Sequence, residues 1–204
     1  PRVPTVAVTG TNGKTTTTRL LARMAAESGR LPGWSTTDGV YIDGACVEPG
    51  DWSGPGGARR VLEDPRVRFA VLETARGGLM LRGMGVASVD VAVFTNVSPD
   101  HLGQHGIDTV EQLAWAKSAV VRVVRARGWA VLNADDPLVR QYHAAGPGRP
   151  WFFATDTDSE GAALPDAARR SADRGRQAER KRGERVVGRM SVRRTLAPAA
   201  RTDG

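Results

Sequence analysis

Residues 3–28 decide the fold, and the centre of this segment at residues 9–16 reads T-G-T-N-G-K-T-T. A β-branched run at 3–8 leads into the glycines, and a helical pattern follows from Lys14 until Gly29 ends it. A strand, a glycine loop and a helix in that order begin a parallel α/β sheet. We therefore predict a three-layer α/β fold with a mostly parallel sheet. The apolar residues that stand at helical spacing in this segment are Leu20, Leu21, Met24 and Ala25.

The glycine loop has the composition of a phosphate-binding loop. Its glycines let backbone N–H groups approach phosphate oxygens, and the positive end of the following helix dipole adds favourable charge. The Lys14 ammonium would reach the β- and γ-phosphates of ATP, and the Thr15 hydroxyl would bind Mg²⁺. Because Val8 stands where the longer motif has a glycine, the match is to the shorter form G-x-x-G-K-T. The residues expected to bind the nucleotide are Gly10, Thr11, Asn12, Gly13, Lys14, Thr15 and Thr16.

Apolar runs and turn signals predict the rest of the domain. Residues 40–47 alternate around Asp43-Gly44 and predict a hairpin. Continuous apolar runs that end in a polar residue suit strands covered on both faces, and such runs occur at 67–73 and 89–96. Further strands are predicted at 129–133 and 151–154. Helices are predicted at 55–63, at 108–127 with Asp108 and Glu111 as a capping box, and from Asp136-Pro137 onward.

Three polar side chains are candidates for chemistry at one edge of this sheet. Glu73 ends a buried strand, and carboxyl ends of strands are where ligands bind in open α/β sheets, so Glu73 and Asn96 are expected to point toward the loop. Glu73 is a candidate Mg²⁺ ligand, and the imidazole of His101 follows the Asn96 strand, where it can coordinate a divalent ion. The alternatives are an acid that leaves the core at a strand end and a loop histidine without function.

Lysine usage singles out Lys117. The chain has three lysines against twenty-six arginines, so a lysine within the 108–127 helix is an unusual choice. A primary amine forms a carbamate with CO₂ and a guanidinium does not readily do so, which indicates amine chemistry at Lys117. A lysine on the helix surface is the alternative.

Composition limits the remaining possibilities. The single cysteine, Cys46, cannot form an internal disulfide, which fits a reducing cytoplasm, and we expect its side chain to be small and half-buried. No apolar run approaches the roughly 18 residues of a membrane helix.

Much of the net charge of +7 lies in residues 155–204, where twelve basic residues stand against eight acidic ones and hydrophobic periodicity fails. We predict a domain at 1–154 and a largely disordered tail at 155–204. These acids, and the absence of aromatic residues beyond Phe153, argue against a nucleic-acid-binding arm.

Taken together in this order, the motifs resemble the ATP-binding central domain of the Mur ligase family over roughly residues 3–154. The matching pieces are G-T-N-G-K-T-T at 10–16, the strand-end Glu73, N-x-x-x-D-H-L at 96–102, A-K-S at 116–118 and L-N-A-D-D-P at 132–137. Within that family, T-T-D-G at 36–39, G-D-W-S-G-P at 50–55 and E-T-A-R-G-G at 73–78 are similar to the Mur-ligase-like module of cyanophycin synthetases.

The resemblance implies an ATP-dependent acid–amino acid ligase. A substrate carboxylate would attack the γ-phosphate of ATP, and an incoming amine would convert the acyl phosphate to an amide. Thr15 and Glu73 would hold one Mg²⁺, and His101 with carbamylated Lys117 would hold a second. In cyanophycin synthesis the carboxylate belongs to an aspartate side chain of the polymer and the amine to arginine. Asn133 and Asp136 would shape the nucleotide side of the pocket.

The chain also departs from the family pattern. The central domain normally continues past the L-N-A-D-D-P strand and helix and precedes a separate C-terminal domain, and neither is recognisable here, so we expect a fragment. One alternative is a catalytically incompetent ATP-binding remnant. Another is a family ligase that acts on a peptidoglycan precursor or folate. The oligomeric state is not determined by the sequence, and a homo-oligomer stays open.

Overall fold

The structure is a computed structural model that describes residues 3–100, 102–103 and 106–155. The tail predicted at 155–204 therefore lies outside the described residues except for Thr155. Within the described ranges, no helix is long and apolar enough to cross a bilayer.

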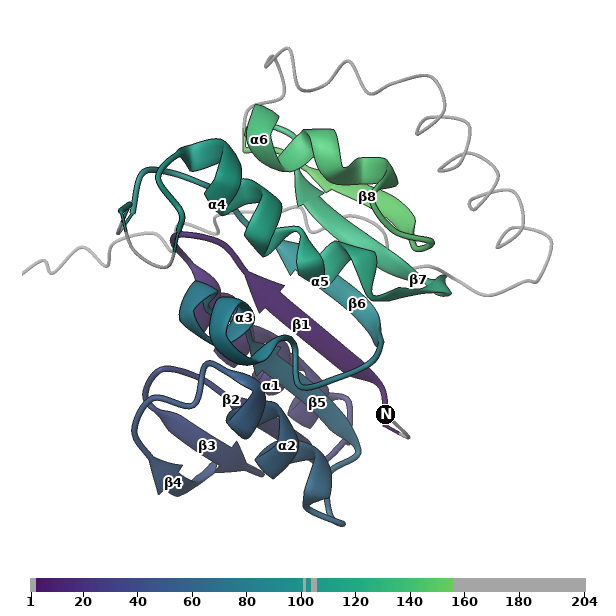
Figure 1. Cartoon of the computed structure of the whole chain (residues 1–204). Helices are drawn as coiled ribbons and strands as arrows, with labels where there is room; N and C mark the ends of the chain where they lie inside the picture. The colour runs from purple at the N-terminus through teal and green to yellow at the C-terminus, as the bar shows by residue number, and fades with distance from the viewer. Residues whose placement is uncertain (1–2, 101, 104–105, 156–204) are drawn as a thin grey trace, which may run out of the picture.

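An eight-stranded sheet forms the centre of the molecule, with the strand order β4-β3-β2-β5-β1-β6-β7-β8 (Figure 1). β1 (Thr5–Thr9) lies between β5 (Phe69–Glu73) and β6 (Val89–Phe94) and runs parallel to both. β7 (Val124–Asn133) and β8 (Arg149–Phe153) continue the parallel sheet on one side, and β2 (Pro32–Ser35) continues it on the other.

An antiparallel hairpin completes the sheet at its β2 edge. β3 (Gly39–Ile42) pairs antiparallel with β2 and with β4 (Ala45–Pro49), and Asp43 and Gly44 form the turn with positive φ angles of 51° and 86°. The predicted hairpin and the predicted mostly parallel sheet are both confirmed. Cys46 on β4 is exposed, so the expectation of a half-buried thiol is wrong.

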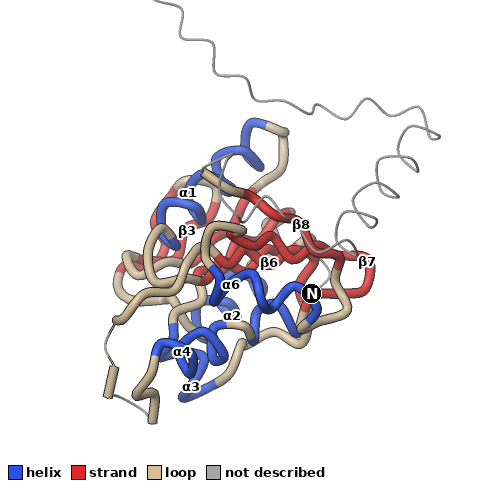
Figure 2. The backbone as a smooth tube through the Cα atoms, turned by 90° about the horizontal axis from the view of Figure 1, so that it is seen from above, coloured by secondary structure: helices blue, strands red, loops and turns tan. Residues whose placement is uncertain are grey.

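Helices lie on both faces of the sheet and make three layers (Figure 2). On one face, α1 (Lys14–Glu27) packs over β5 and β2. The helices of the second face are α2 (Pro55–Glu63), α3 (Arg76–Arg82), α4 (Val110–Lys117), α5 (Ala119–Arg122) and α6 (Pro137–Arg140), followed by the 3₁₀ turn η1 (Gln141–Ala144). On this face, α2 packs over β2, β3 and β5, α5 packs over β6, β1 and β7, and α6 packs over β7. Val6 and Val8 of β1 face α1, whereas Ala7 belongs to the cluster beneath α4 and α5.

Helix α1 turns small residues toward the sheet. Thr18, Ala22 and Ala25 are buried, whereas Leu20 and Met24 are 59% and 61% exposed. The apolar residues at helical spacing therefore do not all lie on the buried side of the helix. Small side chains at the contact let the helix axis approach the strands closely, and the apolar pattern alone does not reveal which stripe is used.

The prediction of one helix at 108–127 is wrong at both ends. Thr109 is the N-cap, and Gln112 completes the capping box, donating from its N–H to Thr109 Oγ1 at 3.2 Å and accepting from the Thr109 N–H at 3.1 Å. The helix breaks at Ser118, α5 ends at Arg122, and β7 begins at Val124 rather than at the predicted Trp129. Successive valines satisfy helical and strand patterns alike, so periodicity cannot locate this boundary.

Candidate nucleotide-binding site

Four neighbouring parallel strands bring the candidate residues to one edge of the sheet. The glycine loop follows β1, Glu73 ends β5, Asn96 follows β6 by two residues, and Asn133 ends β7. Parallel strands share a carboxyl edge, which is where open α/β sheets bind their ligands. The strand order therefore assembles residues that lie more than a hundred positions apart in the chain.

Both glycines of the loop have conformations that side chains disfavour. Gly10 has φ 151°, and a Cβ there would overlap Thr95 Oγ1. Gly13 has φ 81° and is the N-cap of α1, with no side chain capping the helix. The uncapped backbone N–H groups at the start of α1, together with the helix dipole, make this position suited to an anion.

Thr15 and Glu73 form the first candidate metal pair. The Thr15 hydroxyl donates to Glu73 Oε2 at 2.8 Å, and Glu73 is only 2% exposed. Burial raises the pKa of Glu73, while the Thr15 hydrogen bond and the nearby Lys14 charge oppose that rise. Among the described residues no group of three or more acidic, His or Cys side chains gathers to hold an ion. A hydroxyl and one carboxylate still fit Mg²⁺, which usually takes one or two protein ligands and completes its shell with phosphate and water oxygens.

Both predicted lysines donate to carbonyl oxygens of the glycine loop. Lys14 Nζ donates to the Thr11 carbonyl oxygen at 2.8 Å, and Lys117 Nζ, from the last residue of α4, donates to the Gly10 carbonyl oxygen at 2.8 Å. Lys117 is 3% exposed, so the alternative of a surface lysine is wrong. Burial, with the charge of Lys14 as a second cause, lowers the pKa of Lys117 to about 8. Its amine is therefore neutral far more often than that of an exposed lysine.

The remaining loop residues differ in their roles. The N–H groups of Thr11 and Asn12 donate to the Asn96 carbonyl and side-chain oxygens at 2.8 Å and 2.9 Å. Thr16 is exposed, and Thr17, which the motif did not single out, lines the neighbouring pocket. His101, the predicted partner of Lys117 at a second metal ion, lies outside the described residues.

Asn133 and Asp136 act on the loop that follows β6. Asn133 Nδ2 donates to the Thr95 carbonyl oxygen at 2.9 Å, and the residue also lines a pocket that includes Asn12 and Gly13. Asp136 Oδ1 accepts from the Leu138 N–H at 2.9 Å and so caps α6, while its Oδ2 accepts from the Val97 N–H at 2.6 Å. Asp136 therefore has hydrogen bonds on both oxygens within the protein.

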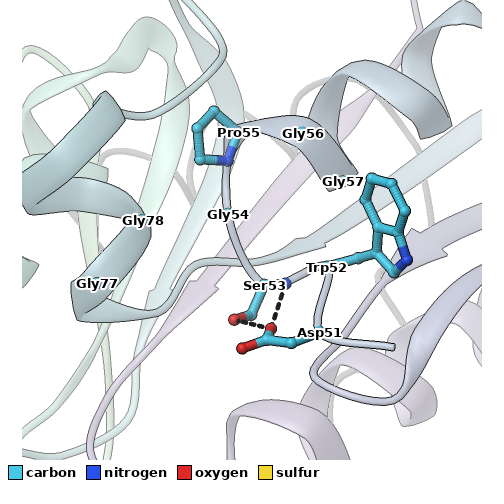
Figure 3. A pocket seen from close by; sticks show the side chains of 9 residues that line it. All are labelled: Asp51, Trp52, Ser53, Gly54, Pro55, Gly56, Gly57, Gly77 and Gly78. Carbon is cyan, nitrogen blue, oxygen red and sulfur yellow. Dashed lines mark hydrogen bonds between the residues drawn. The ribbon is translucent and has the colours of Figure 1, made fainter. Parts of the chain in front are cut away.

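Two pockets lie near this edge of the sheet, and the larger of the two includes residues of the loop. The larger, about 770 Å³, extends from Asn12 and Gly13 over the α1 face of β6, β7 and β8, where Val131, Trp151 and Phe153 make an apolar wall. The smaller, about 230 Å³, lies on the β5 side and is lined by residues 51–57 and by Gly77 and Gly78 (Figure 3).

The smaller pocket is a cradle of glycines beside an acid. Asp51 Oδ1 accepts from the Ser53 N–H at 3.0 Å and the Ser53 hydroxyl at 2.6 Å (Figure 3). A Cβ on Gly78 would lie 2.8 Å from the Gly54 Cα, so the starts of α2 and α3 meet backbone to backbone. The Asp51 charge contributes to the raised pKa of Glu73. The Ala75 N–H donates to the Ser53 carbonyl oxygen at 2.9 Å, so the pocket meets the segment that follows Glu73. Helix α3 was not predicted, because its R-G-G start reads as a loop.

Comparison with known proteins identifies the family. A model of the Mur ligase middle domain matches residues 8–182. The chain is 50% identical to a cyanophycin synthetase of Crocosphaera subtropica over 159 residues, which is 78% of this chain and 18% of that protein. It therefore spans less than a fifth of the length of that relative.

Solved structures share the fold. A UDP-N-acetylmuramoyl-L-alanyl-D-glutamate--2,6-diaminopimelate ligase superposes with a TM-score of 0.61 at 26% identity, covering 78% of this chain and 33% of the other. A bifunctional folylpolyglutamate synthase/dihydrofolate synthase, with Mn, AMPPNP and L-glutamate bound, superposes with a TM-score of 0.55 at 20% identity, covering 74% and 43%. The family match and these likenesses agree with the strand order and the loop: this chain belongs to the Mur ligase middle domain family.

Proposed function

We propose that this chain is the nucleotide-binding part of an ATP-dependent acid–amino acid ligase of the cyanophycin synthetase type. The observation that carries the proposal is the buried Lys117 amine against the Gly10 carbonyl, because phosphate binding alone does not require a second, buried cation behind the loop. The 50% identity to a cyanophycin synthetase supports the choice within the family.

The nucleotide would lie across the sheet edge from the larger pocket to Glu73. Its base would lie against the apolar wall near Asn133, and its phosphates would meet the start of α1. Lys14 would leave the Thr11 carbonyl for the β- and γ-phosphate oxygens, where its charge stabilises the transferring group.

Thr15 and Glu73 would hold one Mg²⁺, and Lys117 as its carbamate, with His101, would hold a second. When bound, such an ion neutralises charge that develops on the phosphate oxygens. The low pKa of Lys117 favours the neutral amine that reacts with CO₂. In support, a relative of the same fold holds Mn, AMPPNP and L-glutamate together.

The substrates would enter from the β5 side. A carboxylate oxygen of an aspartate side chain would attack the γ-phosphorus, the bond from that phosphorus to the β–γ bridging oxygen would break, and ADP would leave. The α-amino nitrogen of arginine would then attack the acyl carbon, with phosphate as the leaving group and a proton released from the amine. The pocket lined by residues 51–57 meets the segment that follows Glu73, where the Ala75 N–H donates to the Ser53 carbonyl oxygen at 2.9 Å, and it is the proposed position for the carboxylate substrate.

A labelled-arginine incorporation assay tests this proposal. The full chain, with ATP, Mg²⁺ and a primer of β-linked Asp-Arg units whose last aspartate keeps a free side-chain carboxylate, is expected to form labelled polymer. Lys14→Ala should abolish the product, whereas Arg23→Ala, on the exposed side of α1, should not change it. Absence of ATP-dependent product from the wild-type chain would sink the ligase assignment.

A second candidate is an ATP-binding remnant without ligase activity. It is favoured by one observation, that the chain spans 18% of the length of its cyanophycin synthetase relative. ATP binding that Lys14→Ala abolishes, combined with no ligation at high protein concentration, would select the remnant over the ligase.

A further inference from the structure

Residues 95–98, which follow β6, are hydrogen-bonded to the glycine loop through backbone and side-chain groups. The Asn96 carbonyl oxygen accepts from the Thr11 N–H at 2.8 Å, and Asn96 Oδ1 accepts from the Asn12 N–H at 2.9 Å. In the opposite direction, Asn96 Nδ2 donates to the Asn12 carbonyl oxygen at 3.1 Å. The side-chain amide of Asn96 is thus paired with both polar backbone atoms of Asn12.

Neighbouring groups reinforce this pairing. Thr95 Oγ1 donates to the same Asn12 carbonyl oxygen at 2.7 Å, and Thr11 Oγ1 accepts from the Ser98 N–H at 3.1 Å. Gly10 permits the close approach, because a Cβ there would meet Thr95 and the Asn96 backbone. The loop is therefore held at several points by residues 95–98.

The pairing decides which amides of the loop can face a ligand. While the Thr11 and Asn12 N–H groups donate to Asn96, they are not available to phosphate oxygens. The donors left for an anion are the N–H groups of Gly13 and the first turn of α1, which have no acceptor within the helix. The left-handed conformation of Gly13 makes the turn between these two sets.

We propose that Asn96 is a positioning residue, which acts through Asn12 to aim the N–H groups of Gly13, Lys14 and Thr15 at the nucleotide phosphates. This inference rests on the proposed binding of ATP at the loop. Its physical basis is preorganisation: donors held in place before the ligand arrives need not be ordered when it binds.

Asn96→Asp provides a pH-dependent test of this role. A neutral carboxyl group keeps one acceptor and one donor and can pair with Asn12 as the amide does, whereas the ionised form places an oxygen against the Asn12 carbonyl. We expect the ATP dissociation constant of the variant, divided by that of the wild type, to rise about tenfold or more as the carboxyl ionises. Dividing the two constants cancels the protonation of ATP itself.

The charged groups around residues 95–98 are the same in the wild type and in Asn96→Asp, so their own titration affects both proteins. These groups are Lys14 and Lys117 on the loop carbonyls, Glu73 at the end of β5, Asp100 near Lys117, and Asp136 on the Val97 N–H. Gln141→Glu, an amide-to-acid change on exposed η1, is the matched control and should leave the ratio at one over the same pH range.

Asn96→Ala separates positioning from simple repulsion of the phosphates. It removes the pairing without adding charge, so we expect ATP affinity about tenfold lower than that of the wild type at every pH tested. A variant that binds ATP as tightly as the wild type would overturn the positioning role, as would a pH-independent ratio for Asn96→Asp. If the wild-type chain itself fails to bind ATP, the proposed function fails and the positioning role fails with it.

Discussion

Lys117 and Gly10 are separated by 107 positions in the chain, yet the Lys117 Nζ donates to the Gly10 carbonyl oxygen at 2.8 Å. The sheet places β6 beside β1, and the connection from β6 to β7 contains α4, whose last residue is Lys117. This connection brings Lys117 to the loop that follows β1. The same contact places an amine with a low pKa beside the glycine loop.

Carbamylation of Lys117 is the first prediction. Incubation of the full chain with ¹³C-bicarbonate is expected to give a carbamate carbon resonance that is absent from Lys117→Met, which has a similar length and no amine. Ligation by Lys117→Met should fall at least about a hundredfold, a loss of roughly 3 kcal/mol in transition-state stabilisation. A wild-type spectrum without the carbamate resonance would contradict the prediction, and so would a Lys117→Met variant that retains ligase activity.

Replacing Glu73 should separate stability from metal binding. Burial raises the pKa of this carboxyl above its unfolded value, so its ionised form opposes folding at pH above the unfolded pKa. In EDTA at pH 7, Glu73→Gln should be more stable than the wild type by up to about 1 kcal/mol, and the gain should shrink as the pH falls through the raised pKa.

Metal dependence gives the second half of that experiment. Mg²⁺ should strengthen ATP binding to the wild type and have little effect on Glu73→Gln, because a neutral amide is a weaker ligand than a carboxylate. Thermal melts and titrations on the same samples measure both quantities. A variant that is less stable in EDTA and retains the full Mg²⁺ effect would refute the assigned role of Glu73.

The sequence predicts most of this site because its signals are local. Gly10, Gly13, Lys14 and Thr15 belong to one short motif, and Glu73 ends an apolar run whose length and polar end mark a buried strand. The hairpin at Asp43-Gly44 is equally local, since two turn residues determine it. Such features require no knowledge of what packs against them.

The errors arise where packing decides. Leu20 and Met24 are apolar but exposed, because the sheet selects the small side chains of α1. The boundary between α5 and β7 lies within a run of valines that suits both structures. The pairing of Asn96 with Asn12 spans two distant segments, and only the neighbouring placement of β1 and β6 brings them together.

Gly10→Ala should damage the loop more than a surface change of the same size. The added Cβ would overlap Thr95 Oγ1, and φ 151° is strained for alanine, so we expect a loss of about 2–4 kcal/mol in the free energy of unfolding. Thr95→Ala should recover part of this loss in the double variant, because the Asn96 backbone still crowds the site. Chemical denaturation of the four proteins measures the coupling, and strictly additive effects would disprove the predicted clash.

Asp64 provides a pH-dependent prediction away from the site. The Arg66 guanidinium and backbone N–H donate to this carboxylate at the end of α2, and they lower its pKa to about 2. A lowered folded pKa means that the stabilisation is complete above the unfolded pKa near 3.8 and disappears as the pH falls toward 2. Asp64→Asn should therefore be less stable at pH 7 by no more than about 1 kcal/mol, since the pair is at the surface.

Melting temperatures of Asp64→Asn and the wild type, measured across that range, check the sign. The difference should be constant from pH 7 to about pH 4.5 and should narrow below it. A difference that grows on acidification would show that another interaction of Asp64 dominates.

Calorimetric titration of the full chain with ATP and Mg²⁺ tests the central claim most directly, with Lys14→Ala and Arg23→Ala measured beside it. Binding at the loop predicts one ATP per chain for the wild type and for Arg23→Ala, and no measurable heat for Lys14→Ala. Equal ATP binding by the wild type and Lys14→Ala, or none by the wild type, would contradict the assignment of the loop from Gly10 to Thr16 as the nucleotide site.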